Sequence, residues 1–91
     1  MSVTLLLPAT FRKETDDQER LQIPGGSVGE VLQGLCERYP SLAGRLFREG
    51  GSLNRFVNVF VNDEDIRFLE DLGTPVQAWD EVLILPALAG G

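Results

Sequence analysis

Few residues of this chain could carry out acid–base or nucleophilic chemistry. The 91-residue sequence contains no histidine and one cysteine, Cys36. The commonest proton shuttle is therefore missing, and no internal disulfide can form. Cys36 falls among apolar residues at helical spacing, where a free cysteine usually behaves as a small hydrophobic side chain. Because no histidine can activate its thiol, we expect Cys36 to pack rather than to act as a nucleophile.

The acidic and glycine-rich motifs also have a local structural explanation. The segment 63–65, Asp-Glu-Asp, lacks the glycine and the distal glutamate of a calcium-binding loop, so we expect a solvated turn and no metal site. The segment 25–29, Gly-Gly-Ser-Val-Gly, matches no phosphate-binding fingerprint and is typical of a turn and helix cap. Asp80 and Glu81 begin a strand and point to opposite faces, so they should not cooperate in catalysis. Trp79 is expected to anchor the edge of the core. We therefore expect no enzyme.

The C-terminal residues Gly90 and Gly91 are different. Average glycine usage is about 7%, so two terminal glycines occur by chance in roughly one chain in 200. They follow a predicted strand, Pro86 and three small or apolar residues. We expect a folded domain over residues 1–86 and a flexible tail over residues 87–91.

Charge and length limit the partners that this chain can have. Eight Lys and Arg residues against fourteen Asp and Glu residues give a net charge of −6, which disfavours nucleic-acid binding. No run of residues is long and apolar enough for a membrane span, and the N-terminus has no features of a signal peptide. The chain is long enough for one small domain, and we expect it in the cytoplasm.

Hydrophobic periodicity predicts the elements that position the tail. Alternating apolar residues predict strands over 3–7, 20–23, 57–61 and 81–85, with a short strand over 66–68 and turns over 15–18 and 62–65. Ser27 and Glu30 form a capping-box pattern, and Pro40 should end the helix that follows. A short helical turn is expected within 41–51. The apolar stripe of the main helix consists of Val28, Val31, Leu32, Leu35, Cys36 and Tyr39.

One helix can cover only one face of such a sheet. The valines of 57–61 should face the helix, so the intervening residues and their neighbours on other strands should lie on the open face. Large apolar residues on an open face usually mark an interaction surface. The residues expected there are Leu6, Phe60, Leu83 and Leu85, with Phe56 also predicted.

These motifs together resemble a known family. The order of elements, the segment 80–86 (Asp-Glu-Val-Leu-Ile-Leu-Pro) and the Gly-Gly end resemble the ubiquitin-like β-grasp sulfur carriers of the MoaD and ThiS type. The segments 55–68 and 84–91 are most similar to the actinobacterial branch that supplies sulfur for cysteine synthesis from O-phosphoserine. Carriers for molybdopterin more often have a second proline where this chain has Ala87.

The resemblance implies an α+β fold, a ubiquitin-like β-grasp with a mixed sheet of four to five strands and one main helix on one face. It also implies that an ATP-dependent, E1-like enzyme adenylates the Gly91 carboxylate and that a sulfur donor converts it to a thiocarboxylate. Gly90, Ala89 and Leu88 would thread the partner's channel. The chain itself would bind no cofactor. The other implied partners are a sulfur-accepting enzyme such as a cysteine-synthase-like protein and a metal-dependent peptidase.

Several alternatives stay open at this point. The chain could be the small subunit of molybdopterin synthase or a thiamin-type sulfur carrier. It could also be a ubiquitin-like protein modifier, although Lys13 is its only lysine, so branched self-chains of varied linkage are not available to it. A passive β-grasp interaction module is the third alternative. The final sulfur acceptor does not follow from the sequence.

Overall fold

The computed structural model describes residues 2–86. Residues 87–91, on which the tail prediction falls and which include Leu88, Ala89, Gly90 and Gly91, lie outside the described residues. The strands are β1 (Ser2–Leu6), β2 (Arg20–Pro24), β3 (Val57–Val61), β4 (Glu64–Asp65) and β5 (Glu81–Pro86), and the α-helices are α1 (Val28–Arg38) and α2 (Ala43–Leu46). Four 3-10 helices complete this part of the chain: η1 (Ala9–Thr15), η2 (Pro40–Leu42), η3 (Ile66–Phe68) and η4 (Asp71–Gly73).

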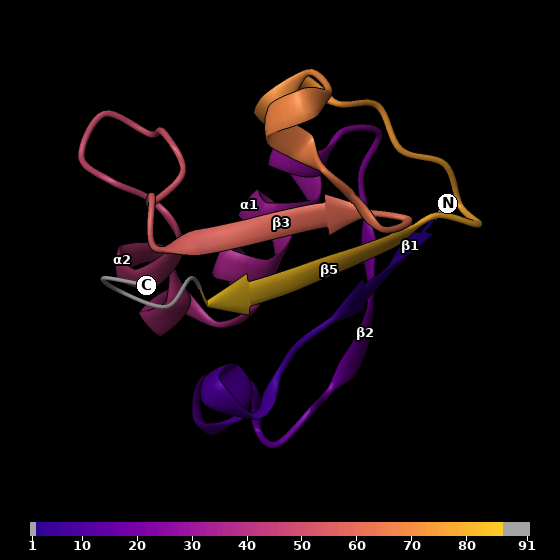
Figure 1. The fold of residues 1–91 in the computed structure, drawn as a ribbon. Helices are drawn as coiled ribbons and strands as arrows, with labels where there is room; N and C mark the ends of the chain where they lie inside the picture. The colour runs from indigo at the N-terminus through magenta and orange to yellow at the C-terminus, as the bar shows by residue number, and fades with distance from the viewer. Residues whose placement is uncertain (1, 87–91) are drawn as a thin grey trace.

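The strands form one mixed sheet in the order β2-β1-β5-β3-β4. β1 and β5 are parallel, and the other neighbouring strands are antiparallel. In Figure 1, α1 lies behind the sheet, and β3 and β5 cross in front of it. The predicted mixed sheet with one main helix on one face is confirmed. The strand that leads into the tail, β5, is an inner strand held by hydrogen bonds on both sides.

The core lies between α1 and the covered face of the sheet. Alternate residues of each long strand point into it, and the valines of β3 face the helix as predicted. The Ser27 side chain accepts a hydrogen bond from the Glu30 N–H (3.3 Å), as an N-cap does. The Glu30 carboxylate accepts from Gly26 N–H (2.7 Å) rather than from the Ser27 N–H expected of a capping box. Fully buried members of this core include Val3, Leu5, Val28, Val31, Leu32, Leu35, Val82 and Ile84.

The β1–β2 connection is more ordered than its polar sequence suggests. Residues 9–15 form η1, and Phe11 and Thr15 are buried. The Thr15 hydroxyl has the carbonyl oxygens of Phe11 (3.3 Å) and Gln18 (3.1 Å) within reach, and a hydrogen bond to either of them satisfies this buried polar group. The predicted turn over 15–18 follows, closed by a Gln18 N–H to Thr15 C=O hydrogen bond (2.9 Å).

Two local predictions are wrong. Residues 66–68 are not a strand, because the Asp65 carboxylate accepts a hydrogen bond from Arg67 N–H (2.9 Å) and caps a 3-10 helix instead. The edge strand is the pair of residues before it, β4. Trp79 does not anchor the core edge: it is 78% exposed. It lies in a turn closed by Asp80 N–H to Gln77 C=O (2.9 Å), and the nearby buried apolar position is taken by Val76.

Candidate docking face and tail exit

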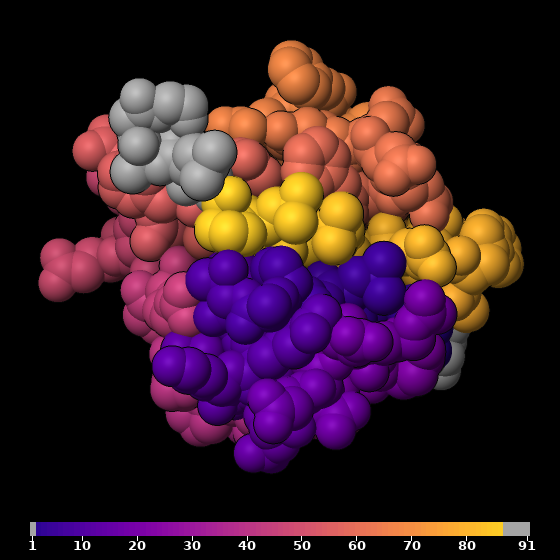
Figure 2. All heavy atoms as spheres, turned by 60° about the horizontal axis from the view of Figure 1, so that its bottom comes forward, coloured from indigo at the N-terminus to yellow at the C-terminus, as the bar shows by residue number. Residues whose placement is uncertain are grey.

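An apolar row crosses the open face of the sheet. In the strand register, Leu6 on β1 lies opposite Leu83 on β5, and Leu83 lies opposite Phe60 on β3. All three side chains are partly exposed. Figure 2 shows the three strands as neighbouring bands, with the yellow atoms of β5 between those of β1 and β3. Within residues 2–86, no α-helix covers this row, so water or a partner must contact it.

Polar groups flank the row where β5 ends. Leu85 lies opposite Asn58, whose side-chain oxygen accepts a hydrogen bond from Arg67 Nη2 (2.8 Å). The same guanidinium forms an ion pair with the Asp65 carboxylate (2.8 Å). Hydrogen bonding to Arg67 lowers the pKa of Asp65, and the pair raises the pKa of Arg67 in turn. The row is therefore bordered on the β4 side by a charged pair held in a fixed position.

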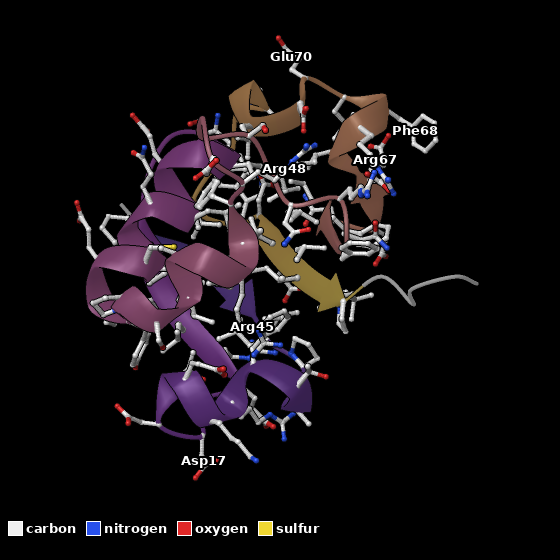
Figure 3. The ribbon with its side chains drawn as sticks, turned by 90° about the vertical axis from the view of Figure 1, so that its left-hand side faces the viewer. Asp17, Arg45, Arg48, Arg67, Phe68 and Glu70 are labelled. Atoms are coloured by element: carbon white, nitrogen blue, oxygen red, sulfur yellow. The ribbon has the colours of Figure 1, made fainter. Side chains whose placement is uncertain are left out.

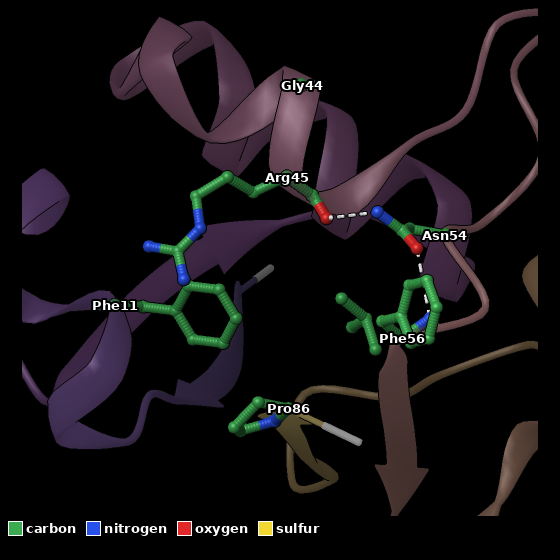
Figure 4. Close-up of a pocket in the computed structure, with 7 residues that line it drawn as sticks. Phe11, Gly44, Arg45, Asn54, Phe56 and Pro86 are labelled. Atoms are coloured by element: carbon green, nitrogen blue, oxygen red, sulfur yellow. Dashed lines mark hydrogen bonds between the residues drawn. The ribbon is translucent and has the colours of Figure 1, made fainter. Parts of the chain in front are cut away.

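A hollow of about 380 Å³ lies where the tail leaves the sheet, at Pro86. Figure 4 shows the Arg45 side chain extended over the Phe11 ring, with Pro86 and Phe56 on the other side of the hollow. The Arg45 guanidinium lies 4.5 Å from the ring centroid and pairs with the Glu14 carboxylate (2.7 Å). Phe56 is 48% exposed. The hollow beside Pro86 is therefore lined by both apolar and charged side chains, and the Arg45 side chain in it is held by its contacts with Phe11 and Glu14.

The start of β5 is fixed by a polar network. Asp80 is nearly buried, and its carboxylate accepts hydrogen bonds from the Asn62 amide (2.7 Å) and the Gln77 N–H (2.7 Å). The Asn62 side-chain oxygen accepts from Glu81 N–H (3.0 Å). Asp80 therefore has a structural role, and Glu81 points away from it into solvent, as the sequence predicts.

Cys36 lies away from the tail exit. Its side chain is partly buried and packs against the core, and this burial raises the pKa of the thiol. A thiol with a raised pKa is a poor nucleophile at neutral pH, which agrees with a packing role. In the described part of the chain, no cluster of three or more His, Cys, Asp or Glu side chains could hold a metal ion. No helix among these residues has the length and apolar character of a membrane span.

The structure brings together most of the predicted docking residues. Leu6, Leu83 and Phe60 form one row, and Leu85 lies one step further along β5. Phe56 precedes β3 and lines the hollow at the tail exit instead. Sequence reasoning missed Arg45, whose partner Glu14 is distant in sequence. It also missed Arg67, because residues 66–68 were predicted as a strand and the contact with Asn58 depends on the 3-10 helix that forms instead.

A match to a protein family accompanies this geometry. The model described as ThiS family matches residues 5–91. This chain belongs to the ThiS family. Its structure is a ubiquitin-like β-grasp, as predicted, and superimposes on a chain of the Amycolatopsis orientalis BexX/CysO crystal structure with a TM-score of 0.89 and 38% identity, covering 98% of this chain and 99% of that one.

Two curated relatives of this ThiS-family chain match over their full length. The sulfur carrier protein CysO of Mycobacterium tuberculosis is 41% identical, with 100% of both chains covered. Small archaeal modifier protein 3 of Haloferax volcanii is 38% identical, again with 100% of both chains covered. Relatives of this chain thus include a named sulfur carrier and a named protein modifier.

Proposed function

We propose that this chain is a sulfur carrier protein, that its Gly91 carboxylate is converted to a thiocarboxylate, and that the sulfur is used for cysteine synthesis from O-phosphoserine. The observation that carries the proposal is the 41% identity to CysO over the whole of both chains. The family match to residue 91 supports a role for the tail itself.

Activation is needed because a carboxylate is a poor electrophile. One Gly91 carboxylate oxygen attacks the α-phosphorus of ATP, and pyrophosphate leaves. A hydrosulfide-equivalent nucleophile then attacks the acyl carbon, and AMP leaves with that oxygen. One oxygen is replaced by sulfur, with no net oxidation or reduction when the donor is hydrosulfide. The chain is a substrate in both steps, and the ATP belongs to the activating enzyme, which is consistent with a cytoplasmic location.

The fold supports this role by holding the root of the tail. β5 is hydrogen-bonded to β1 and β3, and Pro86 pairs with Val57 at its end. Five residue steps from Pro86 to Gly91, at about 3.3 Å each, span roughly 16 Å. That reach is enough to enter an enzyme's channel while the folded domain stays outside. Glycine at positions 90 and 91 removes side-chain bulk in such a channel.

Docking would use the apolar row of Leu6, Leu83 and Phe60, together with Leu85 and the exposed Phe56. We propose an adenylating, E1-like enzyme as the first partner, and a cysteine-synthase-like enzyme as the acceptor of sulfur. A metal-dependent peptidase that releases the product from the tail is a further proposed partner. The row supports this because large, partly exposed apolar side chains on one face favour protein contact.

Intact mass spectrometry tests the proposal directly. The chain is incubated with the activating enzyme of its own organism, ATP and sulfide. We expect the mass to rise by the difference between sulfur and oxygen, and we expect a chain lacking Gly91 to stay unchanged. If the complete chain gains no sulfur while the same enzyme loads its other carriers, the proposal is wrong.

A protein modifier is the second candidate, favoured by the 38% identity to small archaeal modifier protein 3. The same activated Gly91 would then form isopeptide bonds with lysines of other proteins. Blotting a cell extract with an antibody against this chain separates the two functions. A ladder of larger conjugates that disappears when Gly91 is deleted supports the modifier, and a single band at the mass of the chain supports the carrier. If the chain is instead a molybdopterin or thiamin carrier, its sulfur should be transferred to the precursors of those cofactors.

A further inference from the structure

A second hollow, of about 210 Å³, lies next to the root of the tail and is lined by arginines. Arg48, Arg55 and Arg67 line it, and Asp71 is the one carboxylate residue among its described lining residues. The chain has only eight basic residues and a net charge of −6. Three of those eight basic residues therefore gather at one point of an otherwise acidic protein.

Internal ion pairs do not account for this gathering. Arg67 pairs with Asp65 (2.8 Å). Arg48 and Arg55 are both exposed and form no salt bridge with another residue of the range 2–86. The Arg55 guanidinium lies 5.3 Å from the centroid of the exposed Phe56 ring, a contact that leaves its charge without a carboxylate partner among these residues. Like charges held close together repel, and an anion from outside would relieve that repulsion.

The position of this basic hollow connects it to both parts of the proposed site. It shares Asn54 and Val57 with the hollow at the tail exit. It shares Arg67 with the open face, where that side chain reaches Asn58 (2.8 Å). In Figure 3, Arg48 and Arg67 lie on one side of the end of β5, and Arg45 lies on the other. A protein that covers the apolar row and holds the tail would also cover the basic hollow.

We infer that the hollow lined by Arg48, Arg55 and Arg67 binds the carboxylates of an acidic segment on the protein that holds the tail. This inference rests on the proposed function and names the chemistry of its partner. Guanidinium groups bind carboxylates through paired, charge-assisted hydrogen bonds. Outside the hollow the chain has thirteen Asp and Glu residues and only five Lys and Arg residues. The rest of the protein therefore repels the same acidic segment, which favours the docking orientation in which the hollow faces it. The charge pattern thus directs the tail toward the partner's channel.

A titration followed by NMR tests the binding chemistry without any enzyme. The probes are a hexaglutamate peptide and, separately, inorganic phosphate at matched ionic strength. We expect the peptide to shift the Nε–H signals of Arg48 and Arg55 in a saturable way, and phosphate to give only small, non-saturating shifts. Saturation by phosphate alone would make the hollow a free-anion site and overturn the inference, as would an equal response from the exposed Arg38 at the end of α1, which does not line the hollow.

Binding to the activating enzyme tests the role in docking. We expect the double variant Arg48→Glu/Arg55→Glu to bind about tenfold or more weakly at low salt, chiefly through a slower association rate. The matched control is Lys13→Glu/Arg38→Glu, which changes the net charge by the same amount at two exposed positions that line neither hollow and should bind nearly as the wild type does. Equal loss in both variants, or no loss in the first, overturns the inference.

The two proposals fail in different ways. If the wild-type chain gains no sulfur, the proposed function is wrong, and the peptide titration still decides whether the hollow binds carboxylates. If the wild-type chain is loaded and the Arg48→Glu/Arg55→Glu variant is loaded at the same rate at subsaturating concentration, the carrier function stands and the acidic partner segment does not.

Discussion

The two faces of the sheet are made by the same strands but differ in residue type and burial. On the covered face, Val59, Val82 and Ile84 are almost completely buried against α1. On the open face, their sequence neighbours Phe60, Leu83 and Leu85 are also large and apolar but only partly buried. Because successive side chains of a strand point to opposite faces, one residue step separates the two environments.

This difference separates stability from recognition. A side chain that is already buried contributes to folding and has no further surface to remove from water. A partly exposed Leu or Phe still has apolar area that a partner can cover, at roughly 25 cal/mol per Å². We therefore expect substitutions on the covered face to change the free energy of unfolding, and substitutions on the open face to change binding.

The largest effect should come from truncating the covered face. Ile84→Ala removes a fully buried side chain and should lower the free energy of unfolding by about 3 kcal/mol, because it leaves a cavity under α1. Leu85→Ala, one residue along on the open face, should cost about 1 kcal/mol. Urea denaturation of both variants measures the difference. Equal losses would contradict the assignment of the two faces.

The next effect concerns recognition. Leu83→Asp places a charge in the centre of the apolar row and should weaken activation by the adenylating enzyme about tenfold, with little loss of folded structure. Gln22→Asp adds the same charge to the same face on β2, outside the row, and serves as the control. The rate of thiocarboxylate formation at subsaturating carrier concentration measures both. A normal rate for Leu83→Asp would show that the row is not used.

A smaller loss of stability is expected where α1 closely contacts the sheet, at Gly34. A Cβ added at Gly34 would lie 2.9 Å from Ile23 Cγ2, so the helix or β2 must move. We expect Gly34→Ala to lower the free energy of unfolding by about 1 kcal/mol despite the higher helix propensity of alanine. Gly44→Ala in α2 meets no atom within 4 Å and should be neutral or stabilising. Thermal unfolding compares the two, and a stabilised Gly34→Ala variant would contradict tight packing.

Periodicity explains why much of the fold could be predicted. The alternation in β3 and β5 and the stripe on α1 are local patterns, and each is fixed by the face that must be buried. Phe11 gave no such signal, because it is a single large apolar residue in a polar segment, and the Arg45 side chain that lies 4.5 Å from its ring centroid comes from a distant part of the sequence. Residues 66–68 include residue types that favour strands, but the hydrogen bond from Arg67 N–H to the Asp65 carboxylate caps a 3-10 helix there instead.

One part of the candidate site could likewise be predicted from the sequence, and another part could not. The apolar row could be predicted, since alternation and strand order place Leu6, Leu83 and Phe60 on one face. The basic hollow could not, because the loop closed by the Phe47–Leu53 bridge brings Arg48 near Arg55, and the pairing of β3 with β4 brings Arg67 to them. The exposure of Trp79 depends on a turn whose geometry the local sequence does not reveal.

The smallest effect should come from the charged pair beside the row. Hydrogen bonding to Arg67 lowers the pKa of Asp65 below the value of about 3.9 for an unfolded chain. The stability that this pair contributes is therefore present above that unfolded value and is lost as the pH falls through the lowered pKa. Asp65→Asn keeps a capping oxygen but removes the charge, so its melting temperature should be slightly below that of the wild type at about pH 7, and this deficit should shrink as the pH falls through the lowered pKa of Asp65. The deficit should stay small because the Arg67 side chain is 58% exposed and salt screens the pair.

Glu64→Gln, which removes a neighbouring exposed charge, is the control for the Asp65→Asn variant. A deficit that persists at low pH would mean that Asp65 acts through its hydrogen-bond geometry rather than through its charge.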